Sequence, residues 1–225
     1  MKRNIIVAVV SAAVVFFGTG NSNAFPLNFS VSGSIGMGYY NMNELNTMVQ
    51  QIAQDNKIQI PKINKGINVG LHGRIWLFDI AAVTGEYEHF WAESTANLDP
   101  VPLTFKAPAD VYSIGVLAKA YSSASAFDVC VGLSGNFVKS QYGSNIGSGR
   151  ILREYKSDGK GITIYTEVHT NFLHPLEIGT QLGYRFMKIK DFKDKFDNKL
   201  YFNPGSTATI DYGGFYFNIM SGFRI

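Results

Sequence analysis

Eight stretches of the chain alternate apolar and polar residues, and this pattern constrains the fold more than any other feature of the sequence. The first, LNFSVSGSIGMGYY (27–40), carries Leu, Phe, Val, Ile and Met on its odd positions and mainly Asn, Ser and Gly on its even ones. Successive side chains of a β-strand point to opposite faces, so this alternation predicts a strand with one apolar face and one polar face. The other seven stretches are 66–78, 81–91, 111–118, 127–138, 162–171, 176–187 and 209–225.

The segments between these predicted strands alternate between long and short. Long segments follow the first, third, fifth and seventh strands, and short segments follow the second, fourth and sixth. The long ones are 41–65, 92–110, 139–160 and 188–208, and the short ones are 78–80, 119–126 and 172–175. This rhythm of hairpins is typical of an up-and-down antiparallel meander and shows no domain boundary.

One part of the first long segment departs from the β pattern. The stretch NELNTMVQQIAQ (43–54) places Leu45, Met48, Val49 and Ile52 at helical spacing, with Asn43 available as an N-cap. We expect a short helix. If the meander closes into a barrel, this helix would cover one mouth of it. The alternative is a helix that binds a partner or the membrane surface, although it lacks the basic face that such helices prefer.

Three features favour a barrel that stands in a membrane with its apolar face outward. Most predicted strands span about ten to fourteen residues, whereas globular strands have about five or six and a tilted membrane strand roughly nine to eleven. The polar faces carry Gly, Ser, Asn, Thr, Arg and Glu but almost no Lys, and the lysines gather in the long segments. Aromatic residues mark both strand ends, as at a membrane–water interface. On the side of the long segments they are Tyr39, Tyr40, Tyr87, Trp91, Tyr112, Tyr184 and Phe186, and on the other side Phe29, Phe127, Phe172 and Phe223.

The N-terminus has the form of a secretory signal peptide. A basic start (Met1 to Arg3) is followed by an apolar run over 5–18 and by the small residues of Ser22-Asn23-Ala24. We therefore predict a signal peptide over 1–24 and one barrel domain over 25–225, the alternative being a retained anchor helix. Without Lys2 and Arg3 the chain has 18 basic and 17 acidic residues, a balance that argues against a nucleic-acid partner.

The signal peptide, the eight alternating stretches and the closing stretch GGFYFNIMSGFRI make the chain resemble small eight-stranded bacterial outer-membrane β-barrels of the OmpA-like transmembrane type. The resemblance implies export to the outer membrane of a Gram-negative bacterium, a monomeric barrel, and recognition of the last strand by the barrel-insertion machinery. Such proteins usually end on an aromatic residue. This chain ends on Ile225, with Phe223 two positions earlier.

The interior of an eight-stranded barrel is just wide enough for side chains to fill it. Charged side chains inside it are costly unless they are paired. We therefore predict an ion-pair network that closes the lumen, and the alternative is a narrow pore that opens when the pairs exchange. The network residues are Arg74, Glu86, Glu88, Glu167, Glu177, Arg185 and Arg224.

The sequence contains no positive sign of catalysis. A catalytic nucleophile needs a base within reach, and no His–Ser or Ser–Lys spacing marks such a pair. A metal site of His72, His169 and Glu167 would need the three to converge across the barrel. We expect no catalytic residue, no cofactor and no metal. An enzyme that modifies lipid A is the runner-up, because some barrels of the class that the chain resembles do so.

The last long segment is the best candidate for a binding surface. Five of its lysines are interleaved with Asp and Phe, and we predict that they contact the phosphates of lipopolysaccharide. The alternative is an ordinary solvated loop. These lysines are Lys188, Lys190, Lys193, Lys195 and Lys199. The predicted function is a structural or surface-interaction role, with binding of a small apolar ligand under the helix as a further alternative.

Overall fold

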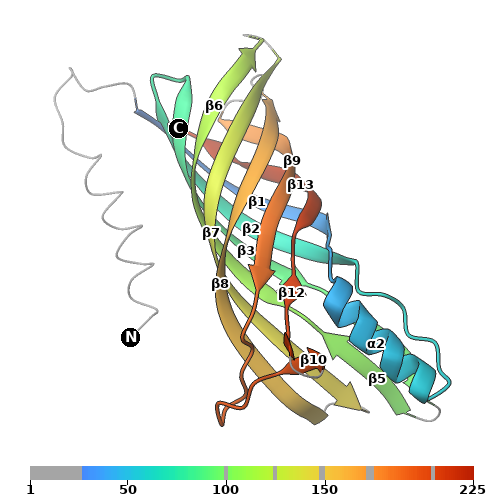
Figure 1. The fold of residues 1–225 in the computed structure, drawn as a ribbon. Coiled ribbons are helices and arrows are strands. Elements are labelled where there is room, and N and C mark those ends of the chain that lie inside the picture. Colours follow the sequence, from blue (N-terminus) through green and yellow to red (C-terminus); the bar gives the residue numbers. More distant parts are fainter. Residues whose placement is uncertain (1–26, 99–100, 124–125, 147–149, 171–174, 204–205) are drawn as a thin grey trace.

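The computed structural model describes residues 27–98, 101–123, 126–146, 150–170, 175–203 and 206–225. The predicted signal peptide lies outside the described residues. Within them, eight antiparallel strands close a barrel (Figure 1). The barrel strands are β1 (Leu27–Tyr39), β2 (Lys65–Leu77), β3 (Ala81–Trp91), β6 (Ala109–Ser122), β7 (Phe127–Ile146), β8 (Arg150–Thr170), β9 (Leu176–Ile189) and β13 (Gly214–Arg224).

Backbone pairing closes the barrel between its first and last strands. Ile35 of β1 lies opposite Val69 of β2 on one side and opposite Ile219 of β13 on the other. Each remaining barrel strand pairs with the barrel strand that follows it in the chain. Closure leaves the barrel without an open sheet edge. The predicted up-and-down barrel of eight strands, with a helix in the first long connection, is confirmed.

The two faces of the strands have opposite character, as their alternation predicts. Ile35 is 59% exposed and Ile114 is 73% exposed on the outer face, whereas His72 and Glu167 on the inner face are fully buried. An apolar band this extensive would be unfavourable in water and is what a bilayer requires of a barrel surface. The opening stretch therefore turns its apolar residues to lipid and its Ser and Gly residues to the lumen.

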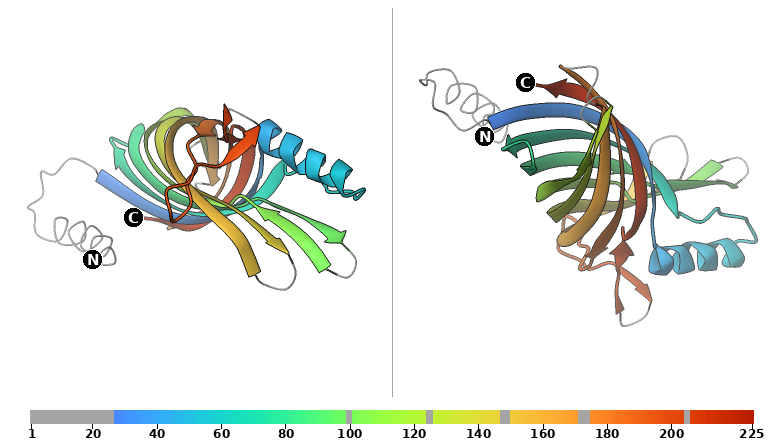
Figure 2. Two further views of the ribbon diagram at one scale, coloured as in Figure 1. Left: turned by 60° about the horizontal axis from the view of Figure 1, so that its bottom comes forward. Right: turned by 90° about the horizontal axis from the view of Figure 1, so that it is seen from above.

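The remaining elements stand at the end of the barrel where the long connections lie, here called the long-loop end (Figure 2). The opposite end, with Leu27, Ile225 and the tight turn at 78–80, is called the short-turn end. The elements at the long-loop end are α2 (Asn43–Asp55), β4 (Glu93–Leu98), β5 (Val101–Lys106), β10 (Tyr201–Asn203), β11 (Ser206–Thr207) and β12 (Ile210–Asp211). No helix within the described ranges is long and apolar enough to cross a bilayer.

Two of the predicted long connections are largely β-structure, which corrects the sequence interpretation. β7 and β8 continue past the barrel as one long hairpin, so most of 139–160 is strand. The segment 92–110 holds the β4–β5 hairpin, and β5 pairs with β7. Beyond the bilayer neither face of a strand meets lipid, so the apolar alternation that marks the strands inside the membrane fades. The last barrel strand is also shorter than predicted, because it begins at Gly214 rather than at 209.

The helix occupies the predicted residues but differs from the prediction in its cap and its position. Its N-cap is Met42, without a side-chain cap, rather than Asn43. Figure 2 shows α2 to one side of the long-loop end and not across the barrel axis. Its buried face, Leu45, Val49 and Ala53, joins an apolar cluster at the long-loop end.

Aromatic side chains pack together at the long-loop end. The ring of Tyr40 lies 5.8 Å from that of Phe90 and 6.1 Å from that of Tyr212. Tyr40 is thus an inner residue, and its predicted place in the outer aromatic belt is wrong because the inward face of β1 continues through position 40. Burial raises the pKa of the Tyr212 phenol, and it does the same for Tyr142 in the same cluster.

Candidate functional site in the barrel lumen

The polar faces of the strands bring charged side chains together inside the lumen. Arg74 of β2 lies at their centre and is 1% exposed. Its guanidinium lies 3.1 Å from a carboxylate oxygen of Glu167 on β8 and 3.4 Å from one of Glu177 on β9. His169 lies 2.8 Å from Glu167 and 3.1 Å from Glu177. These four residues, here called the central cluster, link three strands across the barrel.

A second group lies nearer the long-loop end. Arg185 of β9 pairs with Glu88 of β3. The amides of Asn68 and Asn218 each donate a hydrogen bond of 3.0 Å to Glu88. The Arg185 guanidinium also lies 3.5 Å from the ring centre of Tyr216. The buried Glu88 carboxylate is therefore held by one cation and two amides, which is the pairing that a buried charge requires.

Gln181 joins the two groups. Its amide donates to Glu167 over 2.9 Å, and its carbonyl accepts from Asn218 over 2.9 Å. A continuous polar chain therefore crosses the lumen from Arg74 to Arg185.

Glu86 departs from the predicted network. It faces His72, whose Nδ1 lies 3.7 Å from its Oε1, and no arginine of the described residues lies within ion-pair distance of it. Glu86, one of the four predicted network glutamates, therefore has a histidine and not an arginine as its ion-pair partner. His72 on β2 and Glu86 on β3 are directly opposite in the strand register.

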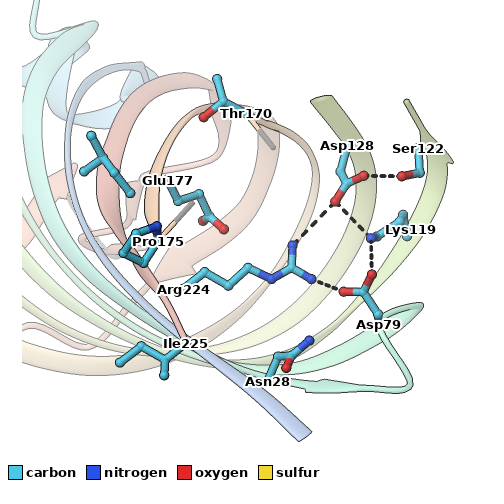
Figure 3. A pocket seen from close by; sticks show the side chains of 11 residues that line it. Asn28, Asp79, Lys119, Ser122, Asp128, Thr170, Pro175, Glu177, Arg224 and Ile225 are labelled. Carbon is cyan, nitrogen blue, oxygen red and sulfur yellow. Dashed lines mark hydrogen bonds and ion pairs between the residues drawn. The ribbon is translucent and has the colours of Figure 1, made fainter. Parts of the chain in front are cut away.

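Arg224 also has partners other than the predicted ones. It lies at the short-turn end, where it pairs with Asp79 and lies 3.5 Å from Asp128. Lys119 lies 3.1 Å from Asp79 and 2.9 Å from Asp128, which completes a ring of two cations and two carboxylates (Figure 3). The expectation that Arg224 pairs with an inner glutamate is therefore wrong.

This ring lines a cavity of about 410 Å³ that opens at the short-turn end. Glu177 also lines it, so the cavity reaches the central cluster (Figure 3). Sequence reasoning missed Asp79, Lys119 and Asp128. Asp128 stands on the polar face of a predicted strand and could have been found, whereas Asp79 lies in a turn with a positive φ of 59° that the alternation does not describe.

The five predicted lysines lie at the long-loop end but do not form one group. Lys188 lies 3.5 Å from Asp211, and Lys193 lies 2.8 Å from Asp197. The hydrogen bond to Asp197 raises the pKa of the Lys193 ammonium. Lys190, Lys195 and Lys199 are exposed, and no carboxylate of the described residues forms an ion pair with any of these three.

Comparison with known proteins gives likeness of fold without likeness of sequence. No family model matches the chain, and no curated protein matches it. A major outer membrane protein from Thermus thermophilus is 10% identical with a TM-score of 0.52, over 88% of this chain and 99% of that chain. OprG from Pseudomonas aeruginosa is 12% identical with a TM-score of 0.44, over 90% of this chain and 96% of that one. A third structure is that of Ail, the attachment invasion locus protein of Yersinia pestis, in complex with the heparin analogue sucrose octasulfate. It is 11% identical with a TM-score of 0.42, over 88% of this chain and 99% of that chain.

Together these findings define the class of protein. The chain has the fold of a small eight-stranded outer-membrane β-barrel, with an apolar outer band and a lumen lined by polar and charged side chains. The likeness concerns the fold alone, and the OmpA-like subtype stays a prediction.

Proposed function

We propose that this protein is an outer-membrane barrel whose lumen is closed and whose long-loop end serves as an interaction surface. The observation that carries the closure is the central cluster, in which Arg74 bridges two carboxylates from neighbouring strands. The buried arginine and its partners occupy the lumen and hold its walls together. The proposal contains no catalytic step, and it treats the barrel as a monomer that the barrel-insertion machinery places in the membrane.

Conductance in planar lipid bilayers tests the closure. We expect no ion-conducting steps from the wild-type barrel, because side chains fill the lumen. A variant with Arg74→Ser and Glu167→Ser removes the bulk and the charge of the central pair, and we expect it to conduct. The matched control is Lys106→Ser with Glu93→Ser, an exposed pair 3.6 Å apart. Steady conductance of the wild-type barrel would contradict the proposal and favour the narrow pore.

A second part of the proposal concerns the partner at the long-loop end. We propose that exposed lysines there contact the phosphates of lipopolysaccharide by charge-assisted hydrogen bonds. The support is the position of Lys190, Lys195 and Lys199, whose charges no neighbouring carboxylate neutralises within the described residues. Phe196, which is 73% exposed beside Lys195, adds an apolar contact.

Replacement of these three lysines by Gln tests that contact. We expect insertion and folding to be unchanged and binding of purified lipopolysaccharide to vesicle-inserted barrel to fall by about tenfold, or about 1.4 kcal/mol. Lys193→Gln is the matched control, because its ammonium is already paired with Asp197. Equal binding by the wild type and the triple variant would refute this part of the proposal and leave the closed lumen unaffected.

A further inference from the structure

Two polar atoms of the lumen lie face to face without hydrogen bonds. They are Nδ1 of His72 and Oε1 of Glu86, and neither has a hydrogen-bond partner among the described residues. The His72 side chain is fully buried and that of Glu86 is 5% exposed. Their separation of 3.7 Å is too long for a hydrogen bond. A buried polar atom left without a partner is costly, so two that face each other call for a group between them.

The other nitrogen of His72 shows which atom is available as a ligand. Nε2 lies 2.8 Å from the hydroxyl oxygen of Ser34. When Nε2 carries the proton and donates it to Ser34, Nδ1 presents a lone pair toward Glu86. Metal-binding histidines have this arrangement, in which the second ring nitrogen donates to a fixed acceptor and sets the tautomer.

A third candidate ligand comes from the central cluster. One carboxylate oxygen of Glu167 lies with the ligand atoms of His72 and Glu86 in a group whose members are all within 4.8 Å of one another. The three residues come from β2, β3 and β8, so the barrel wall fixes their positions. Both oxygens of the Glu167 carboxylate also have partners in the lumen: Gln181 donates to Oε1, and Arg74 and His169 lie against Oε2.

The formal charge of this region favours a cation. Glu86, Glu167 and Glu177 contribute three negative charges, and Arg74 contributes one positive charge. Both ring nitrogens of His169 face carboxylates, so this imidazole counts as a second positive charge. With His72 neutral the sum is minus one, because Glu88 is already paired with Arg185. A cation between His72 and Glu86 would therefore meet net negative charge, which the Arg74 guanidinium beside Glu167 opposes in part.

We propose that His72, Glu86 and Glu167 form a binding site for a divalent transition metal of the Zn²⁺ class inside the lumen. One imidazole and two carboxylates are a ligand set that Zn²⁺ accepts, with water in the fourth position. Ligand atoms on a tetrahedral Zn²⁺ lie roughly 3.4 Å apart, close to the 3.7 Å between Nδ1 and Oε1. Ca²⁺ and Mg²⁺ prefer six or more oxygen ligands and fit this site less well. The site shares Glu167 with the central cluster and would add a cross-link between three strands.

Metal content of the purified barrel tests the proposal. The chain is prepared without an affinity tag and refolded into vesicles with and without Zn²⁺, so that a closed lumen cannot block entry. After removal of loosely bound metal, we expect the wild type refolded with Zn²⁺ to retain one ion per chain and to unfold at a higher urea concentration. Glu86→Gln, which keeps the side-chain shape, and His72→Ala should each lower the affinity for Zn²⁺ by at least about tenfold.

His89→Ala is the matched control, because His89 lies outside the lumen and is paired with Asp110 at 2.7 Å. It should retain Zn²⁺ as the wild type does. Heat-dependent mobility on a detergent gel shows that each variant is folded, and Glu86→Gln decides the question if His72→Ala does not fold. Wild-type barrel that retains no Zn²⁺, or that retains as much as Glu86→Gln does, would overturn the proposal.

Discussion

Arg74→Ala is expected to lower the free energy of unfolding of the vesicle-inserted barrel by about 3–5 kcal/mol, the usual cost of breaking a buried ion pair. The loss arises because Glu167 and Glu177 would remain buried without their shared cation. Urea unfolding followed by tryptophan fluorescence measures the loss.

Two further variants distinguish the loss of a buried pair from a general effect of substitution. Lys156→Ala removes one partner of an exposed ion pair of 3.0 Å and should cost no more than about 1 kcal/mol. Arg74→Met combined with Glu167→Gln and Glu177→Gln removes the charges together and should restore much of the lost stability. If Arg74→Ala costs no more than Lys156→Ala, the central cluster does not support the barrel.

A charge on the outer face should have an effect of similar size for a different reason. Ile35 lies toward the middle of β1 and is 59% exposed on the apolar band. Ile35→Arg is expected to cost about 2–4 kcal/mol, because the guanidinium would have to enter hydrocarbon near the bilayer midplane. The same urea unfolding in vesicles measures this cost.

Phe196→Arg is the control for that substitution. Phe196 is even more exposed, at 73%, but belongs to the connection between β9 and β10 at the long-loop end. An arginine there meets water, and we expect a change below about 0.5 kcal/mol. Equal costs at positions 35 and 196 would mean that Ile35 does not face lipid.

The barrel could be predicted from the sequence because each strand crosses two very different environments. Lipid selects apolar residues such as Ile35 and Val69 on one face, and a narrow lumen selects small or paired polar residues such as Ser32 and Arg74 on the other. That contrast produces a period of two in the sequence. The alternation ends where β7 and β8 leave the membrane. The β7–β8 extension and the β4–β5 hairpin therefore lack the alternating pattern, and the sequence predicts loops there.

The lumen residues could be predicted as a set but not as pairs. Alternation places Arg74, Glu86 and Glu167 on the inner face, yet the partner of each depends on strand tilt and register around the closed barrel. Register puts His72 opposite Glu86, and Arg224 at the short-turn end pairs with Asp79 rather than with an inner glutamate. Asp79 escaped prediction because a turn residue has no place in the alternating pattern.

The central claim is that the odd-numbered face of β1 contacts lipid, and quenching by brominated lipids tests it most directly. The single cysteine of the chain, Cys130, is first replaced by Ser so that it cannot react with the label. A fluorophore is then attached to the new cysteine of Ile35→Cys or, as the water-exposed reference, of Phe196→Cys. The account predicts strong quenching of the label at position 35 by lipids brominated on their acyl chains, with little quenching by aqueous iodide, and the reverse at position 196. A label at position 35 that iodide quenches and brominated lipid does not would contradict the membrane barrel.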